Sequence, residues 1–486
     1  MLFVIVLLSA SCGALKKADD PRKPRTDREE LDEIEGKRVY NPETGKYEYV
    51  KNTPPEPVDT IAWRDPAPDS TPPISSEQGT VITDNPNDPT NPNTDPGGGI
   101  IYNPGTDVDS PKADQYNIAM MLPFLTNQFD PSGNRVPNNS SWAINYYAGA
   151  KMAMDRLNQE NIQLNISVLD TKANETAIPP LLDQAELLNA DLIIGPYRSK
   201  NVQQVADFAL QYQKPLVSPY TASLSVTDDN PYYIQVNPSL KTHCRAIVEH
   251  LRKKYKAEEV TLLARNNNAE LAALKYFQDA NYEFEGSTAT ERFREKIFSD
   301  DSADFINNED FTLLIEPGKT TVFVIPVWAS ESFVSNLLRK ISVSKGANRV
   351  VVYGMPQWMN FNRISPDYFE RLNVHISAAN FTDNTASNIR AFKLDYYNRY
   401  GTLPTEAAFA GYDTLLYFGR MINKYGKRFQ YYIDRDPNRN LHTTFAFEPV
   451  VEPTTTGAED FSKIERFENK FVNILSFQGY RFTLAE

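Results

Sequence analysis

The chain has 486 residues, of which 41% are hydrophobic and 12% aromatic, enough for two or three folding units with cores of their own. Its formal net charge of -13 at pH 7 argues against nucleic acid as a partner, because phosphate binding needs a basic surface. The two cysteines, Cys12 and Cys244, exclude a framework of several disulfides.

The N-terminus is an apolar run, MLFVIVLLSASCG, that ends in small residues directly before Cys12. The run is too short to cross a bilayer as a helix, so it predicts a secretion signal. The letters LSAS before Cys12 resemble a bacterial lipobox. Residues 1–12 are therefore expected to end at a lipidated Cys12 that anchors the protein in the cell envelope, at a periplasmic or outer membrane surface. The alternative is a structural cysteine that follows an apolar start by chance.

Residues 13–113 are rich in proline, asparagine and aspartate, as in NPNDPTNPNTDPGGG. Such a segment buries too little apolar surface to offset its chain entropy, so the sequence predicts a flexible tether. A lipid followed by a long tether would hold the rest of the chain at a distance from a membrane surface.

From residue 116 onward, short apolar runs alternate with segments of helical spacing. In the first half the strand-length runs are YNIAMMLPF, LNISVLD, DLIIGPY and PLVSPY, with the helical segments WAINYYAGAKMAMDRLN, IPPLLDQAELLN and NVQQVADFALQYQ between them. The same rhythm returns later, with EEVTLLAR, TTVFVIPVW and RVVVYGMPQW as strands. This pattern predicts right-handed βαβ units, and hence two α/β lobes whose parallel sheets are flanked by helices, with a cleft between the lobes.

The stretch LIIGPYRSKN stops a buried strand at Gly195 and Pro196, and Ser199 follows where a helix should begin. In open parallel sheets, ligands bind beyond the carboxyl ends of the strands, where helix N-termini present free N–H groups. Ser199 is therefore either a helix N-cap alone or an N-cap that also contacts a ligand.

The motifs of an enzyme are missing from the sequence. The four histidines, His243, His250, His375 and His442, have no metal-ligand spacing. The sequence contains no nucleophile elbow, phosphate-binding glycine loop or Cys-x-x-Cys pair. We expect a protein that is not an enzyme and that needs no metal or cofactor.

One segment, YYNRYGTLPTEAAFAGYDTLLYFGRMI, carries Gly411, Tyr412 and Asp413 ahead of an apolar helix. Together with LDTKANETA, IIGPYRSKNV, PLVSPYTASLSV and VTLLARNNNAELAALKYF, in this order, it makes residues 116–427 resemble type 1 periplasmic binding proteins of the branched-chain-amino-acid receptor class. The resemblance implies a first lobe at residues 114–236 and 372–422 and a second at 237–371. Residues 423–486, which alternate like a β-hairpin near the end, would add strands to one lobe.

The resemblance also implies candidate binding residues. A ligand carboxylate would be held by Ser199 and by the loop that contains Ser218, Thr221 and Ser223. The family's threonine in this loop falls on Ala222, which cannot donate a hydrogen bond. Gln357 replaces the family's glutamate, so a ligand ammonium would lose its acidic partner.

Four aromatic residues end predicted strands toward the cleft and could stack on a sugar or a peptide: Tyr197, Tyr220, Trp328 and Trp358. The alternative for each of them is a packing role in the core.

Two functions remain open at this point. The first is a lipid-anchored receptor that binds a small polar ligand, such as an amino acid, a peptide or a cell-wall fragment, and passes it to a transporter permease or a sensor. The second is a regulatory lipoprotein without a ligand, because lipoproteins that activate cell-wall synthases are similar to this class. Its partner would be such a synthase.

Overall fold

The structure is a computed structural model that describes residues 37–41 and 46–50, then 102, 104–130, 132, 136–223, 225–284, 291–299, 301–453 and 459–485. The chain divides into two compact units, Met1–Thr83 and Asp84–Glu486. Cys12 and most of the predicted tether lie outside the described residues. In the first unit, β1 (Lys37–Asn41) and β2 (Lys46–Val50) pair antiparallel.

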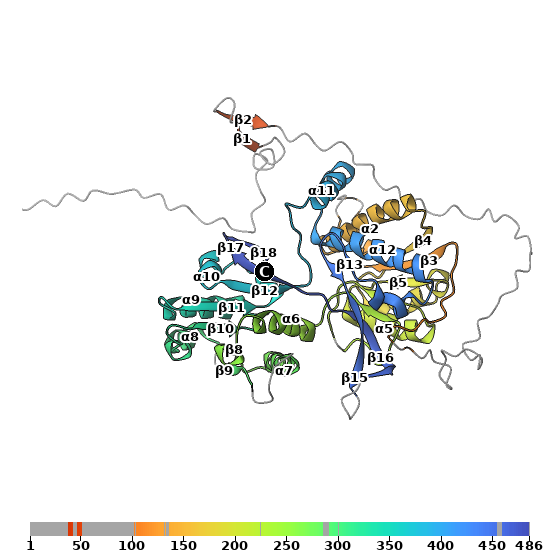
Figure 1. Cartoon of the computed structure of the whole chain (residues 1–486). Helices are drawn as coiled ribbons and strands as arrows, with labels where there is room; N and C mark the ends of the chain where they lie inside the picture. The colour runs from red at the N-terminus through yellow and green to blue at the C-terminus, as the bar shows by residue number, and fades with distance from the viewer. Residues whose placement is uncertain are drawn as a thin grey trace, which may run out of the picture. The chain divides into compact units, whose positions relative to one another are not determined.

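The second unit contains two seven-stranded sheets, each at the centre of one lobe (Figure 1). The strands of the first lobe, in spatial order, are β15 (Phe447–Pro453), β16 (Glu459–Asn469), β7 (Tyr233–Gln235), β6 (Leu216–Ser218), β5 (Leu192–Ile194), β3 (Tyr116–Leu122) and β4 (Leu164–Asp170). The strands of the second are β18 (Arg481–Leu484), β17 (Asn473–Gln478), β12 (Val374–Ala378), β11 (Arg349–Gly354), β10 (Thr320–Val324), β8 (Val260–Arg265) and β9 (Arg294–Phe298). Pairing is parallel except where β15, β17 and β18 join.

Helices cover both sheets. Those of the first lobe are α2 (Ser141–Gln159), α3 (Ile178–Leu182), α4 (Ala185–Leu188), α5 (Ser199–Gln211), α11 (Ser387–Tyr400) and α12 (Glu406–Tyr425). Those of the second are α6 (Leu240–Arg252), α7 (Asn268–Glu283), α8 (Ala303–Asn308), α9 (Glu331–Ser344) and α10 (Pro366–Arg371). Short 3₁₀ turns and a two-stranded ribbon, β13 (Asn438–Arg439) with β14 (Thr444–Phe445), complete the described part. The expected two-lobed α/β fold is confirmed.

Alternation along β3 explains the layers of the first lobe. Ile118 and Met120 belong to a core shared with α2 and α12, whereas Ala119 and Met121 belong to a second core shared with α5. Because successive side chains of a strand point to opposite faces, a strand that is apolar at every position is buried on both. Helices α2 and α12 pack directly against each other over one face (Figure 1).

The chain passes between the sheets three times: from β7 to α6, from β12 to α11, and from β16 to β17. Strand β12 therefore belongs to the second sheet, and the boundary predicted at residues 371 and 372 lies before it rather than after it. The C-terminal residues also differ from the prediction, because β15 and β16 join the first sheet while the hairpin β17–β18 joins the second. Its turn is Gly479 and Tyr480.

The end of the predicted tether is also different, because Tyr102 and Val108 are buried in the core of the first lobe. Backbone and side-chain hydrogen bonds join this segment to residues 427–435. For example, the N–H of Val108 donates to the Tyr432 hydroxyl at 2.9 Å. The folded unit thus begins before residue 113.

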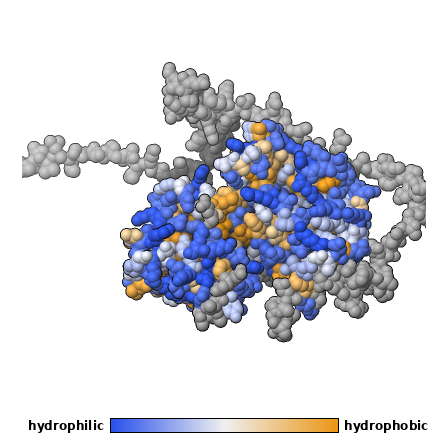
Figure 2. Space-filling view, in the orientation of Figure 1, coloured by the Kyte–Doolittle hydropathy of each residue, from blue (hydrophilic) through white to orange (hydrophobic). Residues whose placement is uncertain are grey.

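The surface of the described residues is mostly hydrophilic in the view of Figure 2, with apolar side chains gathered in the middle of that face. Among the helices of the described part, none combines the length and apolar character needed to span a bilayer.

Candidate functional site

The carboxyl end of β5 makes a close turn at the edge of the first sheet. Gly195 has a φ of +98°, and a Cβ atom there would lie 2.2 Å from the backbone oxygen of Met121. A side chain is therefore excluded twice, by backbone conformation and by the neighbouring strand. The glycine lets the chain turn from the buried strand into α5 within a few residues.

Ser199 is the first residue of α5, and the N-cap position falls on Arg198. The predicted N-cap role for Ser199 is therefore wrong, because Ser199 already lies inside the helix. Instead the exposed Ser199 hydroxyl lies 2.9 Å from the Thr221 hydroxyl, which comes from the loop after β6. Two predicted residues are brought together here, and their hydroxyl groups can share a hydrogen-bond partner.

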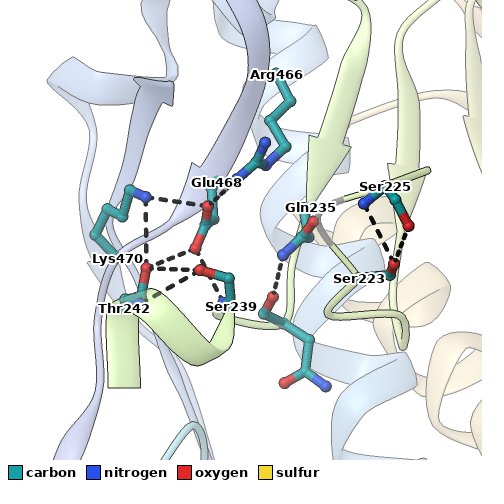
Figure 3. A network of polar contacts seen from close by, with 9 residues as sticks. Ser223, Ser225, Gln235, Ser239, Thr242, Arg466, Glu468 and Lys470 are labelled. Carbon is teal, nitrogen blue, oxygen red and sulfur yellow. Dashed lines mark hydrogen bonds and ion pairs between the residues drawn. The ribbon is translucent and has the colours of Figure 1, made fainter. Parts of the chain in front are cut away.

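The hydroxyl-bearing side chains in and before this loop differ in their exposure to solvent. Ser218 is fully buried at the end of β6, so its side chain is not available to a ligand, contrary to the prediction. Thr221 is mostly buried and accepts a hydrogen bond from the N–H of Ser223 at 3.3 Å. Ser223 is half-buried, and its hydroxyl lies 3.2 Å from that of Ser225 (Figure 3).

Three aromatic side chains meet beside these hydroxyls: Trp142, Tyr197 and Tyr220, called here the aromatic platform. The rings of Tyr197 and Tyr220 stack with centroids 4.1 Å apart, and the ring of Trp142 lies 4.4 Å from that of Tyr197. Burial raises the pKa of Tyr197 above its ordinary value, and the adjacent Tyr220 acts in the same direction, so the phenol of Tyr197 is neutral at pH 7. Sequence reasoning missed Trp142 because it begins a helix and reads as part of the helix's apolar face.

A pocket of about 410 Å³ lies at the carboxyl edge of the second sheet and along the crossing segments. Two predicted residues line it, the half-buried Trp328 and the exposed Gln357. The other lining residues that matter for its chemistry are Ala222, Asn237, His243, Asn360, Asn380 and Glu406. The pocket therefore includes residues of both lobes.

Trp358 does not reach this pocket. Its side chain is fully buried, and its indole N–H donates to the backbone oxygen of Val327 at 2.7 Å. The ring occupies the space above Gly354, where a Cβ atom would lie 2.4 Å from it. The packing alternative is correct for Trp358, because the 3₁₀ turn Pro356–Asn360 directs neighbouring residues to opposite sides.

His243 is the lining residue on α6, and its Nδ1 lies 2.9 Å from the hydroxyl of Ser377 on β12. Burial lowers the pKa of His243 to about 4, although Glu468 acts in the opposite direction. The imidazole is therefore neutral at pH 7 and can serve the pocket as a hydrogen-bonding group but not as a cation.

A buried carboxylate joins two of the crossings. Glu468, at the end of β16, accepts hydrogen bonds from the N–H of Ser239 at 2.9 Å and the hydroxyl of Thr242 at 2.6 Å (Figure 3). It also pairs with Arg466 at 2.9 Å and Lys470 at 3.0 Å. Burial alone would raise the pKa of Glu468, but the two cations and the hydrogen bonds outweigh it and lower the pKa to about 2. This cluster, called the hinge cluster, holds the start of α6 against the end of β16.

Asp413, part of the motif that carried the family resemblance, holds the remaining crossing in place. It is fully buried in α12 and accepts hydrogen bonds from the N–H groups of Leu441 and His442, both at 3.0 Å. The backbone oxygen of His442 in turn accepts from the N–H of Phe381, at 2.7 Å, just after β12. The acid therefore has a structural role and does not line the pocket.

Within the described part of the chain, no group of three or more His, Cys, Asp or Glu side chains gathers as a metal site would require.

A family model described as the receptor family ligand binding region matches residues 146–446, more than half of the chain. Among curated proteins, none matches the chain in sequence.

Three similar solved structures illustrate the fold. A branched-chain amino acid ABC transporter protein from Rhodospirillum rubrum is 13% identical with a TM-score of 0.54, covering 76% of this chain and 99% of that one. A substrate-binding protein from Desulfitobacterium hafniense, in complex with Leu, is 14% identical with a TM-score of 0.50, covering 76% and 100%. Full-length LpoA from Haemophilus influenzae is 12% identical with a TM-score of 0.50, covering 78% and 60%.

At such identities the solved structures are alike in fold, whereas the family match rests on the sequence itself. The two lobes with mostly parallel sheets agree with both comparisons. The chain belongs to the receptor ligand-binding region family and has the fold of type 1 periplasmic binding proteins.

Proposed function

We propose that the protein is a receptor that binds a small polar ligand between its lobes, for transport or sensing. The observation that carries the proposal is the pocket of about 410 Å³ that includes Ala222 of the first lobe, Gln357 of the second and Asn237 of a crossing. Its volume lies within the range of about 300–1,000 Å³ that is usual for small-molecule sites. A ligand that touches both lobes and a crossing would stabilise one arrangement of the lobes over others.

The polar groups around the pocket favour a ligand rich in hydrogen-bonding groups. Beyond the residues that line the pocket, the Ser199 hydroxyl at the first turn of α5 meets that of Thr221, the neighbour of the lining residue Ala222, where backbone N–H groups carry partial positive charge. Gln357 supplies a neutral amide that can both donate and accept. An amino acid, a short peptide or a cell-wall fragment has the carbonyl or carboxylate oxygen that such donors would hold.

The fold supports this class of function without choosing the ligand. One similar structure is a substrate-binding protein solved in complex with Leu. By analogy, the present receptor would deliver its ligand to a transporter permease or to a sensor.

Calorimetry of the full-length protein against amino acids, short peptides and cell-wall fragments tests the proposal. We expect Ser199→Ala and Gln357→Ala each to weaken binding roughly tenfold or more, because each removes a hydrogen bond to the ligand. Gln203→Ala is the matched control for Gln357→Ala, since Gln203 is an exposed glutamine that does not line the pocket.

Tight binding that neither site variant changes would contradict this site. An absence of binding to every class would favour the second function, a regulator without a ligand. LpoA, whose C-terminal domain is described as a regulator of PBP1A in Haemophilus influenzae, would then be the informative comparison. A cell-wall synthase would be the partner to test.

We also propose that a lipid on Cys12 anchors the receptor to a membrane of the cell envelope, because small residues precede this cysteine after an apolar run. Cys12→Ser is expected to move the protein from the membrane fraction to the soluble fraction after cell lysis. Cys244→Ser is the control, since Cys244 is buried in the second lobe. A Cys12→Ser protein that stays in the membrane fraction would contradict the lipid anchor.

A further inference from the structure

The aromatic platform presents ring surface that the protein itself does not cover. Tyr220 is 47% exposed, although its ring stacks on that of Tyr197. The ring of Trp142 also makes an edge contact with that of Tyr220, with the two ring centroids 5.9 Å apart. Tyr197 and Trp142 are half-buried beneath it. A stacked tyrosine is held in place by its neighbours, so a ligand that packs on it need not order the side chain. The platform is therefore a preformed surface for a ring.

The platform does not line the proposed pocket, but it is joined to residues that do. Tyr220 and the pocket-lining Ala222 belong to the same loop after β6. The side-chain amide of Asn237, which also lines the pocket, donates to the backbone oxygen of Tyr220 at 2.9 Å. The Ser199 and Thr221 hydroxyls lie within this same part of the first lobe. A ligand in the pocket can therefore extend onto the platform.

The charges around the pocket disfavour a free amino acid. Among the described residues that line it there is no lysine or arginine, and Glu406 is the sole acid. Its other polar side chains are the amides of Asn237, Gln357, Asn360 and Asn380 together with the neutral His243. A zwitterion would leave at least one charge without an ionic partner as it lost water, at a large cost in free energy. A neutral ligand with many hydroxyl or amide groups avoids that cost.

We propose that the ligand is a neutral saccharide, with one sugar ring stacked on the aromatic platform and its hydroxyl groups bound by the amides and hydroxyls around the pocket. The face of a pyranose presents C–H groups, which are attracted to the negative face of an aromatic ring, and its rim presents hydroxyl groups that both donate and accept. Trp328 offers further aromatic surface inside the pocket for an adjacent ring. This inference rests on the proposed receptor function and names its substrate class.

The test is calorimetry of the full-length protein with neutral saccharides, namely N-acetylglucosamine oligomers, maltotriose and cellotriose, beside free amino acids and dipeptides. We expect a saccharide to bind, with Tyr220→Ala weakening it roughly tenfold or more and Tyr220→Phe by less than about threefold, since phenylalanine keeps the stacking ring. Tyr212→Ala is the matched control. Tyr212 is 46% exposed and packs on Phe208 at 4.5 Å, away from the platform.

Binding of amino acids or dipeptides with no saccharide binding would overturn the saccharide class and leave the receptor function intact. Saccharide binding that Tyr220→Ala and Tyr212→Ala affect equally would overturn the role of the platform. Failure of all these probes would overturn both the inference and the receptor function. The circular dichroism spectrum of each variant, matched to that of the wild type, separates a lost contact from a failure to fold.

Discussion

At the scale of single residues, two tryptophans at similar positions in the sequence pattern differ in burial and in hydrogen bonding. Trp328 and Trp358 each end a predicted strand of the second lobe, but only Trp328 lines the pocket. Trp358 turns inward and gives its indole hydrogen to Val327. The difference follows from the 3₁₀ turn that begins at Pro356, which rotates the residue after Gln357 toward the core.

Replacing Trp358 with phenylalanine should lower the free energy of unfolding by about 2–4 kcal/mol, because the Val327 oxygen loses its donor and the smaller ring leaves a cavity. Trp328→Phe should cost less than about 1 kcal/mol, since that side chain is half-buried and makes no such bond. Urea denaturation of the two variants measures the difference. Equal losses would show that the indole hydrogen bond carries no weight.

At the scale of elements, the contact between α2 and α12 depends on glycine. A Cβ atom on Gly149 would lie 1.8 Å from the backbone oxygen of Ala408, and one on Gly411 would lie 1.9 Å from that of Tyr146. Backbone atoms cannot yield as the end of a side chain can, so the two helices could not approach this closely with any other residue there. This is the physical reason for the glycine in the motif at residues 411–413.

Gly411→Ala should therefore destabilise the protein by about 1–3 kcal/mol, despite the better helix propensity of alanine. Gly419→Ala on the same helix is the control. Its new methyl would meet the mobile end of Leu157 at 2.7 Å, a contact that a small side-chain rotation relieves. Thermal denaturation should give Gly411→Ala a clearly lower melting temperature than Gly419→Ala. The opposite order would contradict the close contact between the two helices.

The hinge cluster predicts a specific dependence on acid. Since the pKa of Glu468 is lowered from its ordinary 4.5 to about 2, the folded protein binds fewer protons than the unfolded chain between these values. Its contribution to stability is complete above about pH 5 and is lost as the pH falls toward 2, a loss on the order of 3 kcal/mol. In Glu468→Gln, which cannot ionise, the slope of stability with pH between 5 and 2 should be smaller than in the wild type. Urea midpoints measured across this range give both slopes, and parallel slopes would refute the assignment.

At the scale of the whole molecule, the described residues from Tyr102 to the start of the first sheet belong to the fold of the first lobe. Tyr102 donates a hydrogen bond to Asp434 at 3.1 Å, and the N–H of Arg428 donates to the Ser110 hydroxyl at 2.9 Å. Together with the burial of Val108, these contacts close the first lobe beside the segment that follows α12.

A protein that starts at residue 114 should accordingly be less stable than one that starts at residue 100, by about 3 kcal/mol or more, because the buried Tyr102 and Val108 are lost. Urea denaturation of the two shortened proteins makes the comparison. Equal midpoints would restore the boundary that composition predicts, at residue 113.

The sequence by itself determined the class of the fold. Apolar runs of strand length between amphipathic helices predict parallel sheets covered on both faces, and the glycine after β5 indicates where the chain must turn at a sheet edge. These features depend on neighbours along the chain, which a sequence records directly. The positions of Ser199 and Thr221 at the carboxyl edge, and of Trp328 and Gln357 at the pocket, follow from the same local pattern combined with the family resemblance.

Only the tertiary structure decided that β12 pairs in the second sheet and that the C-terminal strands divide between the two sheets. It also decided which side chains from distant parts of the sequence are in contact. The hydrogen bond from Ser239 to Glu468, and the tilted contact of the Trp142 ring with that of Tyr197, join residues far apart in the sequence. Local periodicity is the same for a strand in either sheet and for a tryptophan in a core or a pocket. Long-range packing selects among these possibilities, because burial and exposure are properties of the assembled fold. A buried charge is tolerated only where ion pairs and hydrogen bonds offset its desolvation free energy, and those partners also come together only in the assembled fold.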